Sequence, residues 1–516
     1  MSKDVAVLRP LALTGLLVLS ACSGGTVSSR PLAGPTAPRT TAPVDRVTAP
    51  PARPATSTAP RQVLIWKGCG GGFQCSTLRV PLDDPAPAGG TIDLALTRTL
   101  ATNPKARIGS LLINPGGPGA SAVSFLTDNA GQIPAVVRAR FDLVAFDPRG
   151  VGGSAPIRCE TTAELDRYFH LDPAPNDAAG LAALEAGNRA FAAGCRQRSG
   201  RVLPHVSTVE VARDMDRVRA AVGDDKLTYL GYSYGTSLGA AYLAQFPTHV
   251  RAMVLDGALD PTLTWDRLLE GQSKGFDVAL GAYLAECQRT TCAFRQVVKG
   301  DLGAAYDALQ AKVTATPLPG DGTRTVGVGE FSLGVGAGLY SRQFGWPAIS
   351  AGLVAAVRGQ GAVLLSLSDA YLERTAAGYA NLNEANFAVN CIDRPWPRTD
   401  APYLALAKRV ARSSPRFGPS IVLSGLGCAV WPVDAVSRPH AVTGAGAPPV
   451  VVVGTTRDPA TPYIWAQGLA RQLTKAVLLT HIGDGHTAYR AGATPCLTDK
   501  IDAYLLTGKA PVAATC

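Results

Sequence analysis

The sequence predicts an α/β fold with a mostly parallel central sheet and an inserted, mainly helical cap. Three observations predict this fold: short continuous apolar runs typical of buried strands, a G-x-S-x-G turn directly after one such run, and a long alanine- and leucine-rich insertion before the last strands. The chain has 516 residues, of which 46% are hydrophobic. This length accommodates one large core together with an insertion.

The first 62 residues predict export and anchoring. Basic residues precede an apolar stretch over 11–21, which is too short to span a bilayer but fits a signal sequence. The letters LSAC end at Cys22 and are typical of a lipobox, so we expect a signal peptide over 1–21 and lipidation of Cys22. A plain signal peptide with a coincidental cysteine is the alternative. Residues 22–62 are rich in proline, alanine, threonine and serine, which predicts a disordered, lipid-anchored linker.

These features predict a protein of the cell envelope, held by lipid at the extracytoplasmic face of the cell membrane and partly released from it. The formal net charge is +10, but residues 1–22 carry +1 and residues 23–62 carry +4, which leaves +5 for the rest. Nucleic-acid binding is therefore not indicated. The basic linker is expected to lie against anionic lipid or envelope polymers, or to serve solubility alone.

Cysteine usage agrees with export, because ten cysteines remain when Cys22 is set aside. Sequence alone permits many pairings, and we predict the pairing of nearest neighbours. These pairs are Cys69 with Cys75, Cys159 with Cys195, Cys287 with Cys292, Cys391 with Cys428, and Cys496 with Cys516. Zinc is the alternative use of such residues, but no C-x-x-C pair is present and histidines are scarce nearby. We therefore expect no metal.

Residues 229–235 (YLGYSYG) contain the G-x-S-x-G pattern and predict that Ser233 is a nucleophile. The pattern follows a strand-like run over 226–230 and opens a segment of small residues. A strand that turns sharply into a helix imposes strained angles on the serine, and Gly231 and Gly235 leave room for the crossing. A chance match in a chain with 55 glycines is the alternative.

A nucleophilic serine needs a base and an acid, which in this arrangement follow later in the chain. The apolar run 448–455 (PPVVVVGT) predicts a strand, and Asp458 stands in the loop after it. A second apolar run over 476–480 precedes a loop that presents His486. We therefore predict that His486 is the base and that Asp458 orients it. Asp256, which follows the next strand after the serine, is the alternative acid.

Chain order argues against the other histidines as the base, since they precede the strand at 448 or lie at a strand end: His170, His205, His249, His440 and His481.

The segment 114–119 (NPGGPG) follows an apolar strand over 109–113 and predicts an oxyanion-binding loop. The backbone N–H groups of Gly116 or Gly117, together with that of Tyr234, would form the oxyanion hole. An ordinary tight turn is the alternative.

A further strand, 141–147 (FDLVAFD), leads into DPRGVGGS. We interpret Asp147 and Arg149 there as a structural, salt-bridged turn beside the site.

The domain limits follow from these motifs. The core is predicted to comprise 63–265 and 441–516, with a helical cap over 266–440 between the serine and the acid. Segments in the cap carry alanine and leucine at helical spacing between glycines and prolines. Aromatic residues of the cap are candidates for lining substrate subsites or for the cap core: Tyr340, Phe344, Trp346, Trp396 and Trp431.

The motifs PGGPG, DPRGVGGS, LTYLGYSYG, DPATP and GHT resemble those of the secreted tripeptidyl and prolyl aminopeptidases of actinobacteria, within the α/β-hydrolase superfamily. The likeness covers residues 63–516 and extends to mycobacterial envelope lipoproteins that are serine proteases. It implies an α/β-hydrolase fold with Ser233, Asp458 and His486 as the catalytic triad. Proline iminopeptidases begin the early loop with histidine (HGGPG), whereas Pro115 stands here, which leaves selectivity for proline open.

An aminopeptidase must also bind the free α-ammonium group, which favours a carboxylate in the cap. Asp393 and Glu384 are the candidates. The alternative for Asp393 is a salt bridge with Arg394 or a turn cap. Thr461, three residues after Asp458, is expected to support the acid loop.

The sequence therefore predicts a serine exopeptidase, a tripeptidyl or other aminopeptidase, that acts on peptides or proteins with free N-termini. We expect a monomer without a cofactor. Three alternatives stay open: a carboxylesterase or lipase of the envelope, an endopeptidase acting on an envelope protein, and a catalytically silent binding protein.

Overall fold

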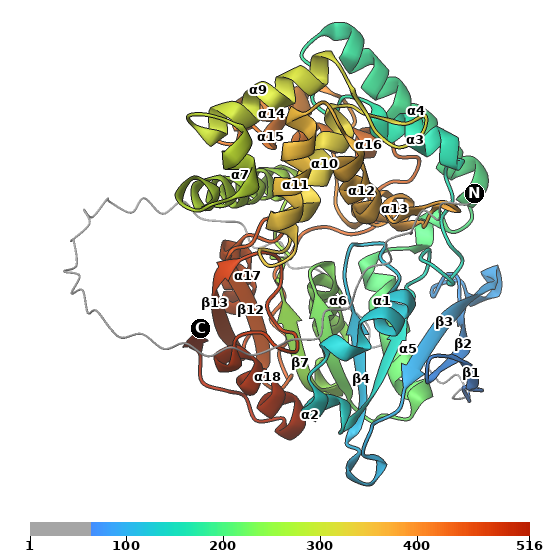
Figure 1. Cartoon of the computed structure of the whole chain (residues 1–516). Coiled ribbons are helices and arrows are strands. Elements are labelled where there is room, and N and C mark those ends of the chain that lie inside the picture. Colours follow the sequence, from blue (N-terminus) through green and yellow to red (C-terminus); the bar gives the residue numbers. More distant parts are fainter. Residues whose placement is uncertain (1–62) are drawn as a thin grey trace, which may run out of the picture. The chain divides into compact units, whose positions relative to one another are not determined.

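The computed structural model describes residues 63–516 (Figure 1). The predicted signal peptide, the lipidated Cys22 and the linker lie outside these residues. Within the described part, no helix is both long enough and apolar enough to cross a membrane.

Ten strands form the central sheet in the order β1-β2-β3-β5-β4-β6-β7-β12-β13-β14. They are β1 (Lys67–Gly70), β2 (Phe73–Pro81), β3 (Thr91–Thr99), β4 (Gly109–Asn114), β5 (Phe141–Phe146), β6 (Leu227–Tyr232), β7 (Val250–Asp256), β12 (Val450–Arg457), β13 (Ala476–Asp484) and β14 (Ala514–Thr515). From β5 to β14 every neighbouring pair is parallel, whereas β1, β2, β3 and β5 pair antiparallel. The predicted α/β fold with a mostly parallel sheet is confirmed.

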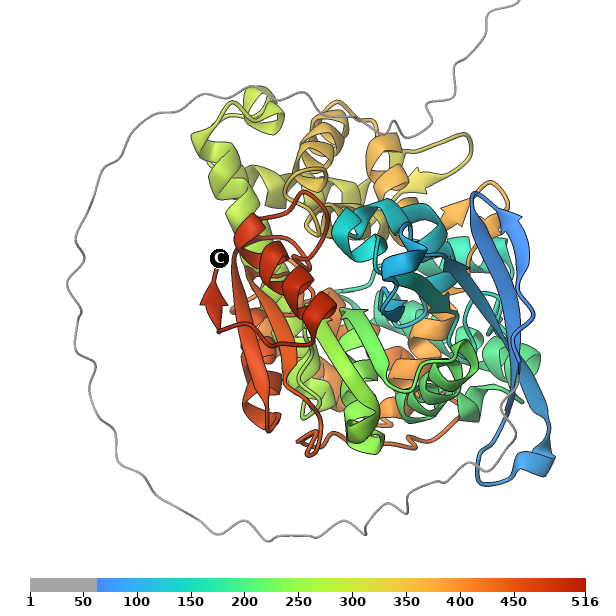
Figure 2. The same cartoon turned by 90° about the horizontal axis from the view of Figure 1, so that it is seen from below.

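Helices cover both faces of the sheet, as the view from below shows (Figure 2). Helices α1 (Ala122–Asn129), α2 (Ala135–Arg138) and α18 (Pro495–Thr507) contribute to one apolar cluster, and α5 (Thr208–Val222), α6 (Tyr234–Gln245) and α17 (Tyr463–Gln472) contribute to another. Strand residues alternate between the two clusters: Tyr229 packs in one and Leu230 in the other. All six residues of β5 and of β6 are buried, which explains their continuous apolar runs.

The cap lies at one end of the sheet (Figure 1). Its helices between β7 and β12 are α7 (Trp265–Arg289), α8 (Ala293–Val297), α9 (Leu302–Ala315), α10 (Val328–Gly338), α11 (Gly345–Val357), α12 (Ala362–Tyr371), α13 (Leu382–Asp393), α14 (Ala401–Val410), α15 (Gly418–Ser424) and α16 (Leu426–Ala429). Two short hairpins accompany them, β8 (Leu318–Pro319) with β9 (Thr325–Val326) and β10 (Arg374–Thr375) with β11 (Gly378–Tyr379). Single 3₁₀ turns occur at Pro87–Gly89, Pro104–Ala106, Ala130–Gln132, Leu203–His205 and Pro247–His249.

Two helices that the sequence analysis placed in the core pack against the cap: α3 (Thr162–His170) and α4 (Ala178–Ser199). Leu184 of α4 shares a buried cluster with residues of α7, α14 and α15. Asp166 of α3 accepts two hydrogen bonds from Arg374, at 2.7 and 2.9 Å. The cap is thus built from two insertions, and the predicted limits 266–440 include only the second of them.

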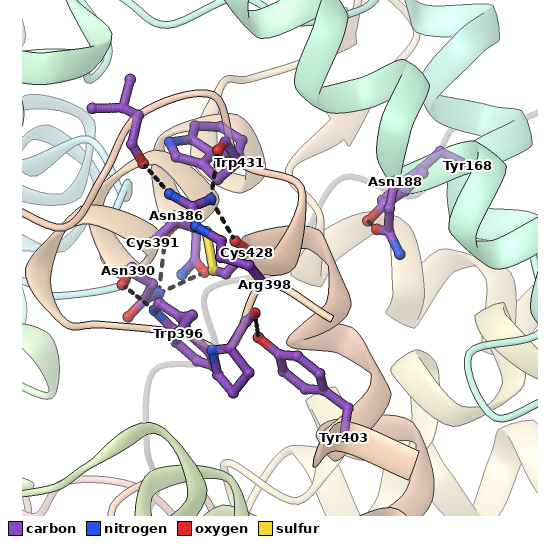
Figure 3. The surroundings of a disulfide bond; sticks show 12 residues. Tyr168, Asn188, Asn386, Asn390, Cys391, Trp396, Arg398, Tyr403, Cys428 and Trp431 are labelled. Carbon is purple, nitrogen blue, oxygen red and sulfur yellow. Dashed lines mark hydrogen bonds between the residues drawn. A yellow bond between two sulfur atoms is a disulfide. The ribbon is translucent and has the colours of Figure 1, made fainter. Parts of the chain in front are cut away.

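The structure contains five disulfides in the predicted pairing. Cys391–Cys428 joins α13 to α16 across 37 residues (Figure 3). Beside it, Trp396 Nε1 donates to Asn390 O at 2.9 Å and Arg398 Nη1 donates to Trp431 O at 2.7 Å. A crosslink over a loop of this length stabilises a folded protein by about 4 kcal/mol in the chain-entropy model. The bond therefore stabilises the part of the cap that contains α13 and α16.

Candidate active site

Ser233 occupies the sharp turn between β6 and α6. Its backbone angles are φ 53° and ψ −125°, a region that non-glycine residues rarely adopt and that costs on the order of 1–3 kcal/mol. A Cβ on Gly231 would lie 2.5 Å from Gly235 O, and one on Gly235 would lie 2.8 Å from Asn114 O. Both positions of the G-x-S-x-G pattern therefore require glycine.

Three hydrogen bonds hold the strained turn. Ser233 N–H donates to Asp256 O at 2.8 Å, while the backbone N–H and the hydroxyl of Thr236 donate to Ser233 O at 2.8 and 2.6 Å. The serine is thereby fixed to the end of the neighbouring strand β7 and to the first turn of α6.

His486 and Asp458 form a buried pair on the loops after β13 and β12. His486 Nδ1 lies 2.8 and 2.9 Å from the two carboxylate oxygens of Asp458. The His486 side chain is 8% exposed and that of Asp458 is fully buried. Asp458 also accepts hydrogen bonds from the N–H groups of Ala460, Thr461 and Thr487, at 2.9, 2.8 and 3.4 Å. The acid loop is thus ordered around the carboxylate that orients the histidine.

Electrostatics favour the protonated form of His486. Burial of the ring lowers its pKa, but the charge and hydrogen bond of Asp458 and the charge of Asp256 raise it more strongly. The net result is a pKa above the usual value of 6.5. An imidazolium formed at this position is therefore stabilised by the protein.

The loop with His486 adjoins the turn with Ser233. A Cβ on Gly257 would lie 3.1 Å from His486 Cε1, and the residue before Gly257 is Asp256, whose carbonyl accepts the Ser233 N–H. His486 Nε2 is buried and has no hydrogen-bond partner within residues 63–516. The nitrogen that Asp458 does not contact is therefore available for proton transfer.

Asp256, the alternative acid, makes different contacts. Its fully buried carboxylate accepts hydrogen bonds from Ala488 N–H at 2.9 Å and from Tyr489 N–H at 2.8 Å, and burial raises its pKa to about 6. These bonds position the chain directly after His486. The geometry therefore favours Asp458, rather than Asp256, as the partner of the imidazole.

The predicted oxyanion loop lies against the serine turn. A Cβ on Gly116 would lie 2.6 Å from Tyr232 O and 2.9 Å from Tyr234 N. Gly116 N–H donates to Asn114 Oδ1 at 2.9 Å and is therefore engaged. The N–H groups of Gly117 and Tyr234 have no hydrogen-bond partner among the described residues. This geometry favours the N–H groups of Gly117 and Tyr234 as the oxyanion donors. Gly116 instead allows the loop to pack closely against the serine turn.

The two predicted ammonium-binding residues are engaged in internal contacts. Asp393 accepts hydrogen bonds from the backbone N–H of Thr208, at 2.9 Å, and from its hydroxyl, and burial raises the Asp393 pKa to about 6. Thr208 Oγ1 lies 2.6 Å from the hydroxyl of Tyr234. Glu384 is 1% exposed and accepts a hydrogen bond from Cys159 N–H at 2.9 Å. Both carboxylates therefore hold α13 against the core, which corrects their predicted assignment to the substrate.

Asp147 and Arg149 are structural, as predicted, but they do not pair with each other. Asp147 accepts hydrogen bonds from the Ser121 hydroxyl at 2.8 Å and from Val123 N–H at 3.0 Å, which fixes the start of α1. Arg149 is fully buried and donates to both carboxylate oxygens of Asp214, at 2.7 and 3.1 Å.

Tyr340 is the cap aromatic residue that contacts the site. Its ring lies 5.1 Å from that of His486 in an edge-on arrangement, and its carbonyl accepts the His486 N–H at 2.9 Å. Trp346 and Trp431 are buried in apolar clusters of the protein, and Phe344 is 70% exposed. No local sequence pattern distinguishes Tyr340 from these other aromatic residues, because its role arises from the docking of the cap on the histidine loop.

One group of possible metal ligands lies among the described residues. Single ligand atoms of Asp83, His205 and Glu210 lie within 4.8 Å of one another. Arg149 Nη1 is 3.4 Å from Glu210 Oε1 and already supplies positive charge there. We therefore assign no metal to this group.

These features define a class of enzyme. Residues 109–489 match the family described as the alpha/beta hydrolase fold, and the chain belongs to that family. Serine protease Hip1 of Mycobacterium tuberculosis is 40% identical over 455 residues, which cover 86% of each chain. Carboxylesterase B of the same species is 39% identical over 449 residues, which cover 85% of each chain.

Tripeptidyl aminopeptidase of Streptomyces lividans is 34% identical over 472 residues, which cover 88% of this chain and 86% of the relative. The resemblance found in the sequence motifs is therefore confirmed, and the protein is a serine hydrolase. Relatives named as a protease and as an esterase are almost equally similar to it, so these names alone do not decide between peptide and ester substrates.

We expect Gly116→Ala to lower the rate of hydrolysis by about a hundredfold, because the added Cβ would overlap Tyr232 O and displace the backbone of Ser233 and Tyr234. Initial rates on a chromogenic short-chain ester measure this effect. Gly131→Ala is the matched control, since a Cβ there meets nothing within 4 Å and its activity should be retained. Full activity of Gly116→Ala would contradict the close packing of this loop on the serine turn.

Proposed function

We propose that the protein is a serine exopeptidase that cleaves short peptides or single residues from free N-termini. The observation that carries this proposal is the strained Ser233 turn next to the buried His486–Asp458 pair. The names of two relatives, a serine protease and a tripeptidyl aminopeptidase, support peptides as the substrate. The carboxylesterase relative keeps ester hydrolysis as the alternative function.

In the proposed mechanism, Ser233 Oγ attacks the carbonyl carbon of the scissile peptide while His486 Nε2 takes the hydroxyl proton. Asp458 stabilises the imidazolium that forms, and the N–H groups of Gly117 and Tyr234 stabilise the oxyanion. Collapse of the tetrahedral intermediate breaks the C–N bond, and His486 returns the proton to the departing amine. Water then hydrolyses the acyl-enzyme by the same steps, with His486 as base and then as acid.

Exopeptidase action favours a carboxylate that binds the substrate ammonium group, and we assign this role to Glu373. This residue follows α12 in the cap and has a φ of 52°, one of four positive values at non-glycine residues of the described chain. Its carboxylate has no hydrogen-bond or ion-pair partner within that chain. Burial and the charge of Asp147, the residue that fixes the start of α1, raise the pKa of Glu373.

An ammonium group at Glu373 would relieve the repulsion between the two carboxylates. Unlike Asp393 and Glu384, Glu373 has a carboxylate that is free to contact a ligand.

The pH profile tests the role of His486. Because its pKa is raised and the neutral form is the base, kcat/KM should fall on acidification with a midpoint above pH 6.5. Asp458→Asn removes the main cause of the raised pKa and should lower kcat by about 10⁴. Steady-state rates of the purified full-length protein between about pH 5 and about pH 9 measure both effects. A profile without an acidic limb would contradict His486 as the base.

Paired peptides with free and acetylated N-termini test the exopeptidase proposal. We expect cleavage of the free-amine peptide only, and an increase of about tenfold or more in its KM in Glu373→Gln because the charge partner of the ammonium group is lost. Hydrolysis of a short ester, which lacks the ammonium group, should change far less. Glu270→Gln, at a side chain that is 52% exposed, is the matched control.

Equal cleavage of both peptides would favour an endopeptidase. Ester hydrolysis without any peptide cleavage would favour the esterase. An unchanged KM in Glu373→Gln would contradict the assignment of ammonium binding to Glu373. It would not contradict exopeptidase action itself.

A further inference from the structure

A cavity of about 380 Å³ lies between the cap and the loop that follows β13. The cap contributes residues 340–343, directly after α10, and the core contributes residues of the segment 481–494. The cavity adjoins the predicted triad but is not part of it, because its wall includes the two neighbours of His486, Gly485 and Thr487, and not the imidazole itself.

Backbone contacts join the cap side of the cavity wall to the loop that carries His486. Ser341 and Gly485 form an isolated β-bridge, and His486 N–H donates to Tyr340 O at 2.9 Å. Thr487 has a φ of 64°, a strained value for a β-branched residue. A ligand in the cavity would therefore contact the same backbone segment that positions the catalytic imidazole.

The cavity presents one positive charge that the protein does not neutralise. Arg490 lines it, and its guanidinium has no hydrogen-bond or ion-pair partner among residues 63–516. Arg342, also in the wall, is already compensated, since it lies 2.6 Å from Glu286 and 3.6 Å from Asp484. Asp484 in turn pairs with Arg457 at 2.5 Å.

The imidazole of His481 adds a polar but uncharged group to the cavity wall. Burial and the nearby Arg490 lower the pKa of His481, although Asp484 opposes this, so the ring is neutral near pH 7. Its Nδ1 is buried without a hydrogen-bond partner among the described residues. The cavity therefore combines an unpaired guanidinium with a neutral imidazole, which suits a carboxylate ligand.

The order of strands indicates which part of a substrate would reach this cavity. The oxyanion loop follows β4, Ser233 follows β6, and His486 follows β13, so the oxyanion loop and the histidine lie on opposite sides of the serine. The histidine must give its proton to the departing nitrogen, so the leaving group lies on the histidine side. The cavity borders the histidine loop on that side.

Two exposed apolar side chains follow wall residues in the sequence. Phe344, directly after the cap wall, is 70% exposed, and Ile482, directly after His481, is 61% exposed. Neither side chain is part of the cavity wall.

We propose that this cavity is a subsite for the leaving peptide and that Arg490 binds a carboxylate of that peptide. The carboxylate is either an aspartate or glutamate side chain or the C-terminal carboxylate of a short substrate. This inference rests on the proposed peptidase function and assigns it a preference for acidic leaving segments.

Two pairs of peptides with one shared free-amine acyl segment test the subsite. In the first pair the leaving segment carries Glu or Gln, and in the second it ends in a free carboxylate or an amide. Mass spectrometry locates the cleaved bond, and initial rates of the full-length protein give kcat/KM. We expect about a tenfold preference for the acidic member of at least one pair, and the pair that shows it identifies the source of the carboxylate.

Arg490→Gln should reduce this preference to near one, whereas Arg490→Lys, which keeps the charge, should retain part of it. Arg471→Gln, at an exposed residue of α17, makes the same change of charge elsewhere and should keep the full preference. Cleavage of both pairs without preference, or an unchanged preference in Arg490→Gln, would overturn the subsite alone. Absence of all peptide cleavage in the unmodified protein would overturn the proposed function and the subsite with it.

Discussion

The candidate active site depends on Asp256, which connects the Ser233 turn to the His486 loop. The carbonyl of this residue accepts the N–H of the strained Ser233, and its buried carboxylate accepts the N–H groups of Ala488 and Tyr489 just after His486. One residue at the end of β7 thus fixes two loops that are more than 250 positions apart in the chain. A carboxylate with a pKa raised to about 6 is costly to bury, and the hydrogen bonds of the two backbone amides offset that cost.

The cap is joined to the chemistry through the same loop. Tyr340 accepts the His486 N–H and packs its ring on the imidazole, while Asp393 reaches Thr208, whose hydroxyl contacts that of Tyr234. Cap residues therefore contact the histidine loop directly and are linked through Thr208 to the helix that begins after Ser233. Because Tyr340 and Gly485 also border the cavity with Arg490, the proposed subsite for the leaving peptide and the loop that carries His486 share one structural element.

The sequence predicts those parts of the structure that local chemistry determines. The buried runs at 141–147 and 448–455 and the glycines around Ser233 each follow from short-range rules, and the strands and the turn lie where these rules place them. Strand β1 is exposed, and β2 and β3 contain exposed as well as buried residues, so these antiparallel strands lack continuous apolar runs and were not predicted. The roles of Asp393 and Glu384 were not predictable either, since their partners Thr208 and Cys159 lie 185 and 225 positions away. In the same way, the packing of α4 on the cap depends on Leu184 meeting residues far along the chain.

Covalent labelling of Ser233 tests the central claim most directly, that the strained serine and the buried His486–Asp458 pair act as one catalytic unit. A fluorophosphonate probe, which reacts with activated serines, would be incubated with the full-length protein and the modified peptide identified by mass spectrometry. The account predicts that Ser233 is the labelled residue and that His486→Ala and Asp458→Asn each slow the labelling by orders of magnitude while the fold is retained. Labelling at another serine, or at Ser233 with an undiminished rate in both variants, would contradict it.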